Sequence, residues 1–388
     1  EKGTLINSAQ FDGIDATSAR DKITEYAQSQ GFGEFKTQYR LRDWLISRQR
    51  YWGAPIPIVY CPHCGEVPVD ESSLPVLLPE DVDFSVKGKS PIETSATFKE
   101  TICPKCGAKA TRDTDTMDTF VCSSWYYLRY ADAKNDKECF NRDLVNKWLP
   151  VDQYIGGIEH AILHLLYSRF FTKALRDCGL LDFDEPFANL LTQGMVLKDG
   201  SKMSKSKGNT VDPDEIYANY GADTARLFIL SDSPPARDFD WTDAGVEGCY
   251  KFISRVYRLY SKFQDRIKLD YEFDVKNLSK KDDDFVRQVH IAIKKITHDI
   301  ENEFQFNTVI SSYRELTNTL YEYTKNENEI NNDVLSFGLL TLLKLISPVC
   351  VFMAEEIYSG LGAAKSIHEL DWPKFDENLA KTSAITLI

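Results

Sequence analysis

Lysine and serine side chains gather in the stretch Lys202-Met203-Ser204-Lys205-Ser206, which continues as Lys207-Gly208-Asn209. Lysine carries a compact positive charge on a flexible stem, and three lysines within six residues suit a polyphosphate whose charge grows in a transition state. The stretch is not a Walker loop, because it lacks the G-x-x-x-x-G-K pattern. An ordinary solvated loop is the alternative, and these residues alone leave both interpretations open. We call residues 202–209 the lysine loop.

Two apolar, strand-like runs precede the lysine loop, and a helix follows it. The runs cover Phe187 to Gln193 and Met195 to Leu197, with a turn at residues 198–201. Asp212 is a favourable N-cap, and Pro213 suits the first turn of a helix. The lysines are therefore expected on a small, polar loop between a strand and a helix.

A second glycine-rich turn lies upstream, at Gly156-Gly157. It follows an apolar run from Val151 to Ile155 and precedes a helical pattern, as in the strand–turn–helix of a nucleotide-binding α/β sheet. Glu159 can accept hydrogen bonds from ribose hydroxyls or from an amine. His160 and His164, four residues apart, could bind a metal, but no H-E-x-x-H pattern and no third ligand is evident.

Four cysteines form two matching knuckles, Cys61-Pro62-His63-Cys64 and Cys103-Pro104-Lys105-Cys106, each followed by glycine. Two C-P-x-C-G knuckles fit a closed tetrahedral Zn²⁺ site with a structural role. A disulfide pair or a redox C-x-x-C are the alternatives.

Arginines are interspersed with the aromatic residues Trp44, Tyr51 and Trp52 between Arg40 and Gly53. Such a mixture suits contacts with phosphates and bases. The alternative is an amphipathic helix with Trp44, Leu45 and Tyr51 packed inward, and composition leaves both open.

The composition of the chain excludes some functions. Its 388 residues allow two to three domains. The net charge of −13 argues against a surface coated in basic residues for nucleic acid, so any RNA contact must use local basic patches. No apolar run reaches the ~18 residues of a membrane span. Nine cysteines, an odd number with five of them scattered singly, fit a reducing cytoplasm.

The C-terminal part, residues 242–388, is predicted to be helical throughout. Apolar residues recur with helical spacing from Val246 to Arg266, Leu278 to Asn302, Asn307 to Lys325 and Val334 to Ile346. Another helix is expected to begin at Pro348. The pattern predicts an antiparallel helical bundle.

Several of these motifs resemble one family. Lys202 to Ser206 is similar to the KMSKS signature of class I aminoacyl-tRNA synthetases. Arg42 to Gly53 resembles a block that the leucine, isoleucine and valine enzymes share. Asp118 to Tyr127 and Gly156 to Tyr167 resemble the blocks of leucyl-tRNA synthetases of the bacterial type. The resemblance covers nearly the whole chain.

This resemblance implies the architecture. The expected fold is an α/β Rossmann-like half-domain with a zinc-knuckle insertion, followed by an all-α helical bundle. The catalytic core would span residues 34–60 and 107–241, with the insertion at 61–106. Residues 1–33 would end an editing domain, and residues 242–388 would form an anticodon-binding type of bundle.

The resemblance also implies the reaction and its residues. The family activates leucine with Mg²⁺ and ATP, then transfers it to tRNA(Leu). Lys202 and Lys205 would be catalytic, stabilising the leaving pyrophosphate, and Tyr127 and His160 would border leucine. Arg48 and Arg50 would guide the tRNA end. The ATP-binding residues would be Gly156, Gly157, Glu159, Gln193, Met195, Val196, Lys202, Met203, Ser204, Lys205 and Ser206.

One departure from the family matters. Its other ATP motif, H-x-G-H, is formed by none of the six histidines. The expectation is therefore a fragment that is inactive alone and is partnered by an upstream segment carrying that motif. The alternatives are an isoleucyl or valyl type of synthetase, against which the Gly-Gly-Ile-Glu-His-Ala block argues, and a non-catalytic zinc-knuckle scaffold that binds RNA.

Overall fold

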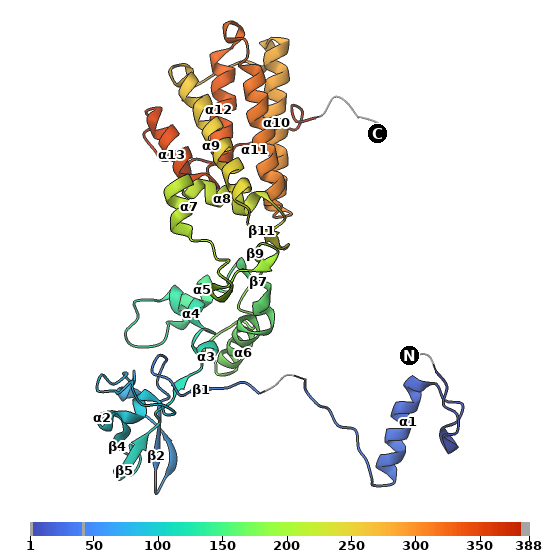
Figure 1. Ribbon diagram of the computed structural model, residues 1–388, viewed down its shortest axis with the longest axis vertical. Coiled ribbons are helices and arrows are strands. Elements are labelled where there is room, and N and C mark those ends of the chain that lie inside the picture. Colours follow the sequence, from blue (N-terminus) through green and yellow to red (C-terminus); the bar gives the residue numbers. More distant parts are fainter. Residues whose placement is uncertain (1–2, 41–42, 382–388) are drawn as a thin grey trace. The chain divides into compact units, whose positions relative to one another are not determined.

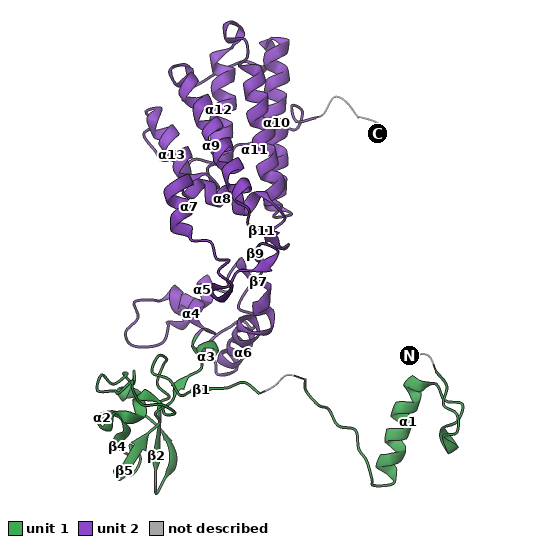
Figure 2. Ribbon diagram, viewed as in Figure 1, with its two compact units in different colours: residues 1–122 green, residues 123–388 purple. Residues whose placement is uncertain are grey.

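The computed structural model describes residues 3–40 and 43–381. These residues fall into two compact units, which divide between Cys122 and Ser123 (Figure 2). Leu41 and Arg42 of the arginine-rich stretch lie outside the described residues. So do residues 1–2 of the predicted editing-domain segment and residues 382–388 of the predicted bundle.

The N-terminal unit begins with helix α1 (Ala16–Ser29). Its N-cap is Asp15, whose carboxylate accepts hydrogen bonds from the amides of Thr17 (3.1 Å) and Ser18 (3.0 Å). Upstream of this helix, Thr4 makes an isolated antiparallel bridge with Asp15.

The two cysteine knuckles lie in an antiparallel sheet of four strands in the order β3-β2-β5-β4; β2, β4 and β5 of this sheet are labelled in Figure 1. A small core of Val59, Val67 and Ala110 packs with two of the cysteines. The elements are β2 (Ile58–Cys61), β3 (Gly65–Pro68), α2 (Ala96–Lys99), β4 (Glu100–Ile102) and β5 (Lys109–Arg112).

The arginine-rich stretch is not helical where it is described. It contains strand β1 (Ser47–Arg48), which pairs antiparallel with β6 (Thr116–Met117). The short helix α3 (Thr119–Cys122) directly follows β6. The amphipathic-helix interpretation of this stretch is therefore wrong. A strand pairing between segments so far apart in sequence leaves no local periodicity to detect.

The C-terminal unit opens with α4 (Tyr126–Ala131) and α5 (Arg142–Trp148), followed by a strand–helix–strand element. Strands β7 (Tyr154–Gly157) and β8 (Leu190–Gln193) are parallel and are joined through helix α6 (His164–Asp177). Parallel strands need such a crossover connection. This element supplies the α/β character expected from the glycine-rich turn.

A three-stranded sheet follows in the order β10-β9-β11. Strands β9 (Val196–Lys198) and β10 (Ser201–Lys202) form a hairpin whose turn residues, Asp199 and Gly200, both have positive φ. Strand β11 (Phe239–Asp240) lies parallel to β9, and between β10 and β11 the chain forms α7 (Pro213–Tyr220) and α8 (Ala222–Ser231).

The predicted helical runs appear as helices that pack lengthwise against one another (Figure 1). Eleven of the fifteen residues of α12 are buried, so this helix lies at the centre of the core. Leu227 and Phe228 of α8 share the same hydrophobic core, which therefore continues across the predicted boundary at residue 242. The helices are α9 (Asp243–Phe263), α10 (Lys280–Glu301), α11 (Phe306–Tyr323), α12 (Asn332–Ile346) and α13 (Val351–Gly360).

Across the described ranges, no helix combines the length and the apolar character that crossing a membrane requires.

Candidate functional site

The carboxyl ends of β7 and β8 bring two predicted nucleotide-binding positions together. Gly156 lies opposite Thr192, and Gly157 lies opposite Gln193. Ligands of α/β sheets bind at this edge, beyond the carboxyl ends of parallel strands. A Cβ atom on Gly157 would lie 2.3 Å from Oε2 of Glu159, so the glutamate carboxylate folds back over the glycine. The main chain at Gly157 and the carboxylate of Glu159 thus lie together at the carboxyl edge of β7 and β8.

The turn after β7 is a short 3₁₀ helix, Ile158–Ile162, which presents Glu159 and His160. Nδ1 of His160 is buried and has no hydrogen-bond partner among the described residues. The His160 ring lies edge-on to that of His164, with 6.2 Å between the centroids. The chain therefore carries a polar atom at this turn that a ligand could satisfy.

Behind this turn, a chain of hydrogen bonds links β7 to α6. The hydroxyl of Tyr154 lies 2.8 Å from Nε2 of His164 and 2.7 Å from the hydroxyl of Tyr126. Ser168 lies 3.3 Å from Nδ1 of the same histidine. Burial, and secondly the charge of nearby His160, lower the pKa of His164, so it is neutral at physiological pH.

Tyr127, predicted to border leucine, lies in the packed interior at 5% exposure. Its hydroxyl lies 2.8 Å from that of Thr172, and burial raises its pKa to about 12. Its contact with an amino acid stays a prediction.

The β9–β10 hairpin begins at Val196, directly after Met195, and ends at Lys202, which pairs with Leu197 beside Val196. Two aspartates of the β11 segment tie it down: Asp238 accepts the amide of Met195 (2.5 Å), and Asp240 accepts the amide of Gly200 (3.0 Å). The lysine loop therefore follows β10, the edge strand of a hairpin that these aspartates hold at Met195 and Gly200.

The lysine loop itself contains a 3₁₀ turn, Lys205–Lys207, which ends at Gly208 with positive φ. The hydroxyls of Ser204 and Ser206 lie 2.7 Å apart. Lys202 and Lys205 are exposed, and neither forms an ion pair with a described residue. Their ammonium groups are thus available for an anion.

Asn209 holds the lysine loop, and Asp238 and Asp240 hold the hairpin that precedes it. None of the three was predicted from the sequence. Each acts through contacts with main-chain groups of another segment. A single polar residue of this kind gives no periodic signal. Asn209 alone could have been noticed, because it ends the run Lys207-Gly208-Asn209 that continues the lysine stretch.

Arg48 and Arg50, predicted to guide RNA, make contacts within their own unit. Arg48 pairs with the buried carboxylate of Asp118 at 2.5 Å, and Arg50 donates a hydrogen bond to the hydroxyl of Thr119. Asp118 also accepts the amide of Phe120 (2.9 Å) at the start of α3. Contact of either arginine with RNA stays a prediction.

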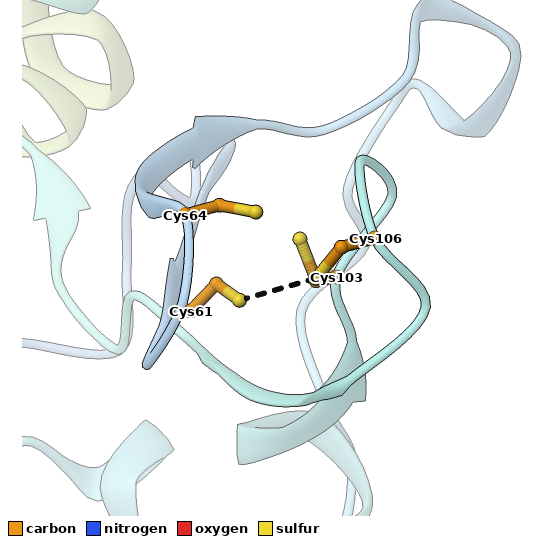
Figure 3. Close-up of side chains that lie close together, drawn as sticks. All are labelled: Cys61, Cys64, Cys103 and Cys106. Carbon is orange, nitrogen blue, oxygen red and sulfur yellow. Dashed lines mark hydrogen bonds between the residues drawn. The ribbon is translucent and has the colours of Figure 1, made fainter.

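The four knuckle cysteines converge, with their Sγ atoms all within 4.8 Å of one another (Figure 3). The Sγ atoms of Cys61 and Cys106 lie 3.6 Å apart. Tetrahedral zinc with Zn–S bonds of about 2.3 Å needs sulfurs about 3.8 Å apart, so the cluster is compatible with zinc. Gly65 and Gly107 both have positive φ, as the tight knuckle turns require.

Comparison with known proteins identifies the class. Residues 16–242 match the family model of class I tRNA synthetases (I, L, M and V), and residues 282–388 match that of the anticodon-binding domain of tRNA ligases. The chain belongs to the class I tRNA synthetase family.

Within this family, the chain is similar to curated leucine–tRNA ligases. All of this chain aligns with leucine–tRNA ligases from Symbiobacterium thermophilum (49% identity, 48% of that protein) and Petrotoga mobilis (50% identity, 47% of that protein). The chain therefore spans about half the length of the curated relatives it matches.

Solved structures agree with this class. A crystal structure of LeuRS from Agrobacterium radiobacter, in a ternary complex with tRNA and LeuAMS, matches 97% of this chain and 48% of that one, with a TM-score of 0.87 and 39% identity. Methionyl-tRNA synthetase of Mycobacterium tuberculosis, bound by methionyl-adenylate, matches 68% of this chain and 52% of that one, at a TM-score of 0.50 and 18% identity, which shows a shared fold alone.

Proposed function

We propose that this chain belongs to a leucine–tRNA ligase, which activates leucine with ATP and transfers it to tRNA(Leu). The observation that carries the proposal is the pairing of Gly157 with Gln193 at the carboxyl edge of two parallel strands. Alignment of the whole chain with leucine–tRNA ligases at 49–50% identity supports leucine as the substrate.

The ribose and adenine of ATP would lie along this edge and its neighbour. Gly156 and Gly157 let the nucleotide approach the main chain, and Glu159 would accept hydrogen bonds from the ribose hydroxyls. Adenine would contact Gln193, Met195 and Val196, which follow one another from β8 into β9.

The lysine loop would bind the phosphates. Lys202 and Lys205 would stabilise the negative charge on the pyrophosphate as it leaves, because their ammonium groups have no competing ion pair within the described chain. Met203, Ser204 and Ser206 would line the same loop. Mg²⁺ would enter with ATP, bound to its phosphates.

The leucine side of the site would lie at the turn after β7. His160 offers a buried Nδ1 atom without a described partner. Tyr127 would support this side from the interior, where its ring lies edge-on to Phe187 with 5.3 Å between centroids.

Zn²⁺ would be held by Cys61, Cys64, Cys103 and Cys106, and its role would be structural. Four thiolates close a tetrahedral site and leave no position for substrate. The ion would fix the two knuckles to each other in a sheet whose own core is small.

For tRNA, we propose contacts by Arg48, by Arg50 and by the helical bundle, since residues 282–388 match an anticodon-binding family. A reducing cytoplasm fits the free thiols of all nine cysteines.

Calorimetric titration with a non-hydrolysable leucyl-adenylate analogue tests the proposal. We expect the chain to bind it, and to bind the isoleucyl and valyl analogues more weakly. Preference for the isoleucyl or valyl analogue would favour another member of the family. RNA binding with no affinity for any of the three would favour a non-catalytic scaffold.

A further inference from the structure

One side chain bridges both strands of the β9–β10 hairpin and the lysine loop. Oδ1 of Asn209 accepts the main-chain amide of Ser204 at 2.8 Å. Its Nδ2 donates to the hydroxyl of Ser201 at 3.1 Å, and lies 3.3 Å from each of the carbonyl oxygens of Lys198 and Lys202. A single carboxamide thus reaches β9, β10 and the loop.

The chemistry of these partners fixes the orientation of the amide. An N–H group can only donate, and a carbonyl oxygen can only accept. The oxygen of Asn209 must therefore face Ser204, and its nitrogen must face Lys198 and Lys202. Reversing the amide would place two donors face to face at Ser204 and would set the carboxamide oxygen against two carbonyl oxygens, so one orientation of the side chain is strongly preferred.

These contacts lie beside the two lysines proposed to bind phosphate. Asn209 bonds to the carbonyl of Lys202 itself and to the amide of Ser204, which directly precedes Lys205. The lysine side chains are long, exposed and without described ion pairs, so the positions of their ammonium groups depend on the main chain beneath them. Charge stabilisation is effective when the charged groups are held in place beforehand.

We propose that Asn209 is the positioning residue of the lysine loop: it closes the loop onto the β9–β10 hairpin and so sets where Lys202 and Lys205 meet the phosphates. This rests on the proposed function of the loop. Asn209 does not itself touch the substrate. It acts through the Ser204 amide and the Lys202 carbonyl.

Two substitutions distinguish the contribution of the amide oxygen of Asn209 from that of its amide nitrogen. The Asn209→Ala variant removes all four contacts. The Asn209→Asp variant keeps an acceptor for the Ser204 amide and loses both donors. Asn219, exposed on α7, provides matched controls in Asn219→Ala and Asn219→Asp.

Hydrogen exchange measures how well the Ser204 amide of the lysine loop is protected, and it needs no ligand. In Asn209→Ala we expect the Ser204 amide to exchange at least about tenfold faster, with the midpoint of thermal unfolding unchanged. In Asn209→Asp we expect this amide to stay protected. Equal protection of Ser204 in the wild type and in Asn209→Ala would overturn the proposal, as would a large fall in the unfolding midpoint.

Calorimetry with a β,γ-non-hydrolysable ATP analogue and Mg²⁺ measures how the loss of these Asn209 contacts changes the affinity for the nucleotide. We expect both Asn209 variants to bind about tenfold more weakly, and both Asn219 variants to bind like the wild type. Unchanged affinity with a loosened loop would overturn the positioning role alone. No binding by the wild type would instead refute the proposed function of the site and this role with it, and the exchange data would still report whether Asn209 holds the loop.

Discussion

Gly157 and Gln193 lie directly opposite one another at the carboxyl ends of the parallel strands β7 and β8. They are far apart in sequence, and helix α6 lies between them. Their pairing places a residue without a side chain next to a residue with a hydrogen-bonding amide. In the proposed site, that combination would let a nucleotide approach the main chain while the Gln193 side chain forms hydrogen bonds with it.

Gly194, directly after β8, lies against the main chain of Arg237 and should not tolerate a side chain. A Cβ atom there would lie 2.1 Å from the carbonyl carbon and 2.2 Å from the oxygen of Arg237, which are main-chain atoms. We expect Gly194→Ala to lower the free energy of unfolding by at least about 2 kcal/mol, measured by urea denaturation.

The control is Gly248→Ala in α9, where an added Cβ meets nothing within 4 Å. This variant should gain about 0.5–1 kcal/mol, because alanine is the better helix former. Similar stability of the two variants would contradict the close packing at Gly194.

Asp223 joins α8 to the start of α13. Its buried carboxylate accepts the amides of Phe352 (3.3 Å) and Met353 (2.7 Å), which are free donors at a helix N-terminus. We expect Asp223→Ala to reduce the free energy of unfolding by about 1–3 kcal/mol, because those buried amides lose their acceptor.

Asp232→Ala serves as the comparison, since Asp232 is exposed at the end of the same helix. It should change stability by less than about 0.5 kcal/mol. If both substitutions cost the same, the cap on α13 would not contribute as described.

The bundle was the most predictable part of the fold. Helix α10 runs from Lys280 to Glu301, close to the predicted Leu278–Asn302, because apolar spacing and the Ser279 cap are local signals. Strand β1 was missed, since its partner β6 lies in a distant segment. At the site, the lysines stand out by composition. Asn209, Asp238 and Asp240 do not, because their role depends on which main chain the fold brings to them.

The cysteine cluster should hold about one zinc ion per chain, measured by elemental analysis of the purified protein. The Cys103→Ser variant should lose the metal, because Cys103 is 1% exposed and is one of the four clustered thiols. The Cys139→Ser variant, at an exposed cysteine outside the cluster, should retain it. Zinc retained in Cys103→Ser, or absent from the wild type, would rule out this site.

The buried His164 should make stability depend on pH. Its pKa lies below the ordinary value, first because of burial and then because of His160. As the pH falls below about 6.5, the unfolded chain takes up a proton that the folded chain resists, so stability decreases until the folded pKa is reached.

Urea denaturation at several pH values between 7.5 and 5 measures this effect. We expect the wild type to lose stability more steeply than His164→Gln, by at most about 1.4 kcal/mol per pH unit. Glutamine does not titrate, so the difference between the two isolates His164 from other groups such as His290. Equal slopes would show that the histidine titrates alike in the folded and unfolded chains.

The most direct test of the central claim is the affinity of the chain for a β,γ-non-hydrolysable ATP analogue with Mg²⁺, measured by calorimetry for the wild type, Lys205→Ala and Lys147→Ala. Lys147 is an exposed lysine of the same unit, on α5. If the lysine loop binds the phosphates, Lys205→Ala should weaken binding about tenfold, and Lys147→Ala should leave it unchanged. Equal affinity in all three proteins, or no binding by the wild type, would contradict a phosphate site in this loop.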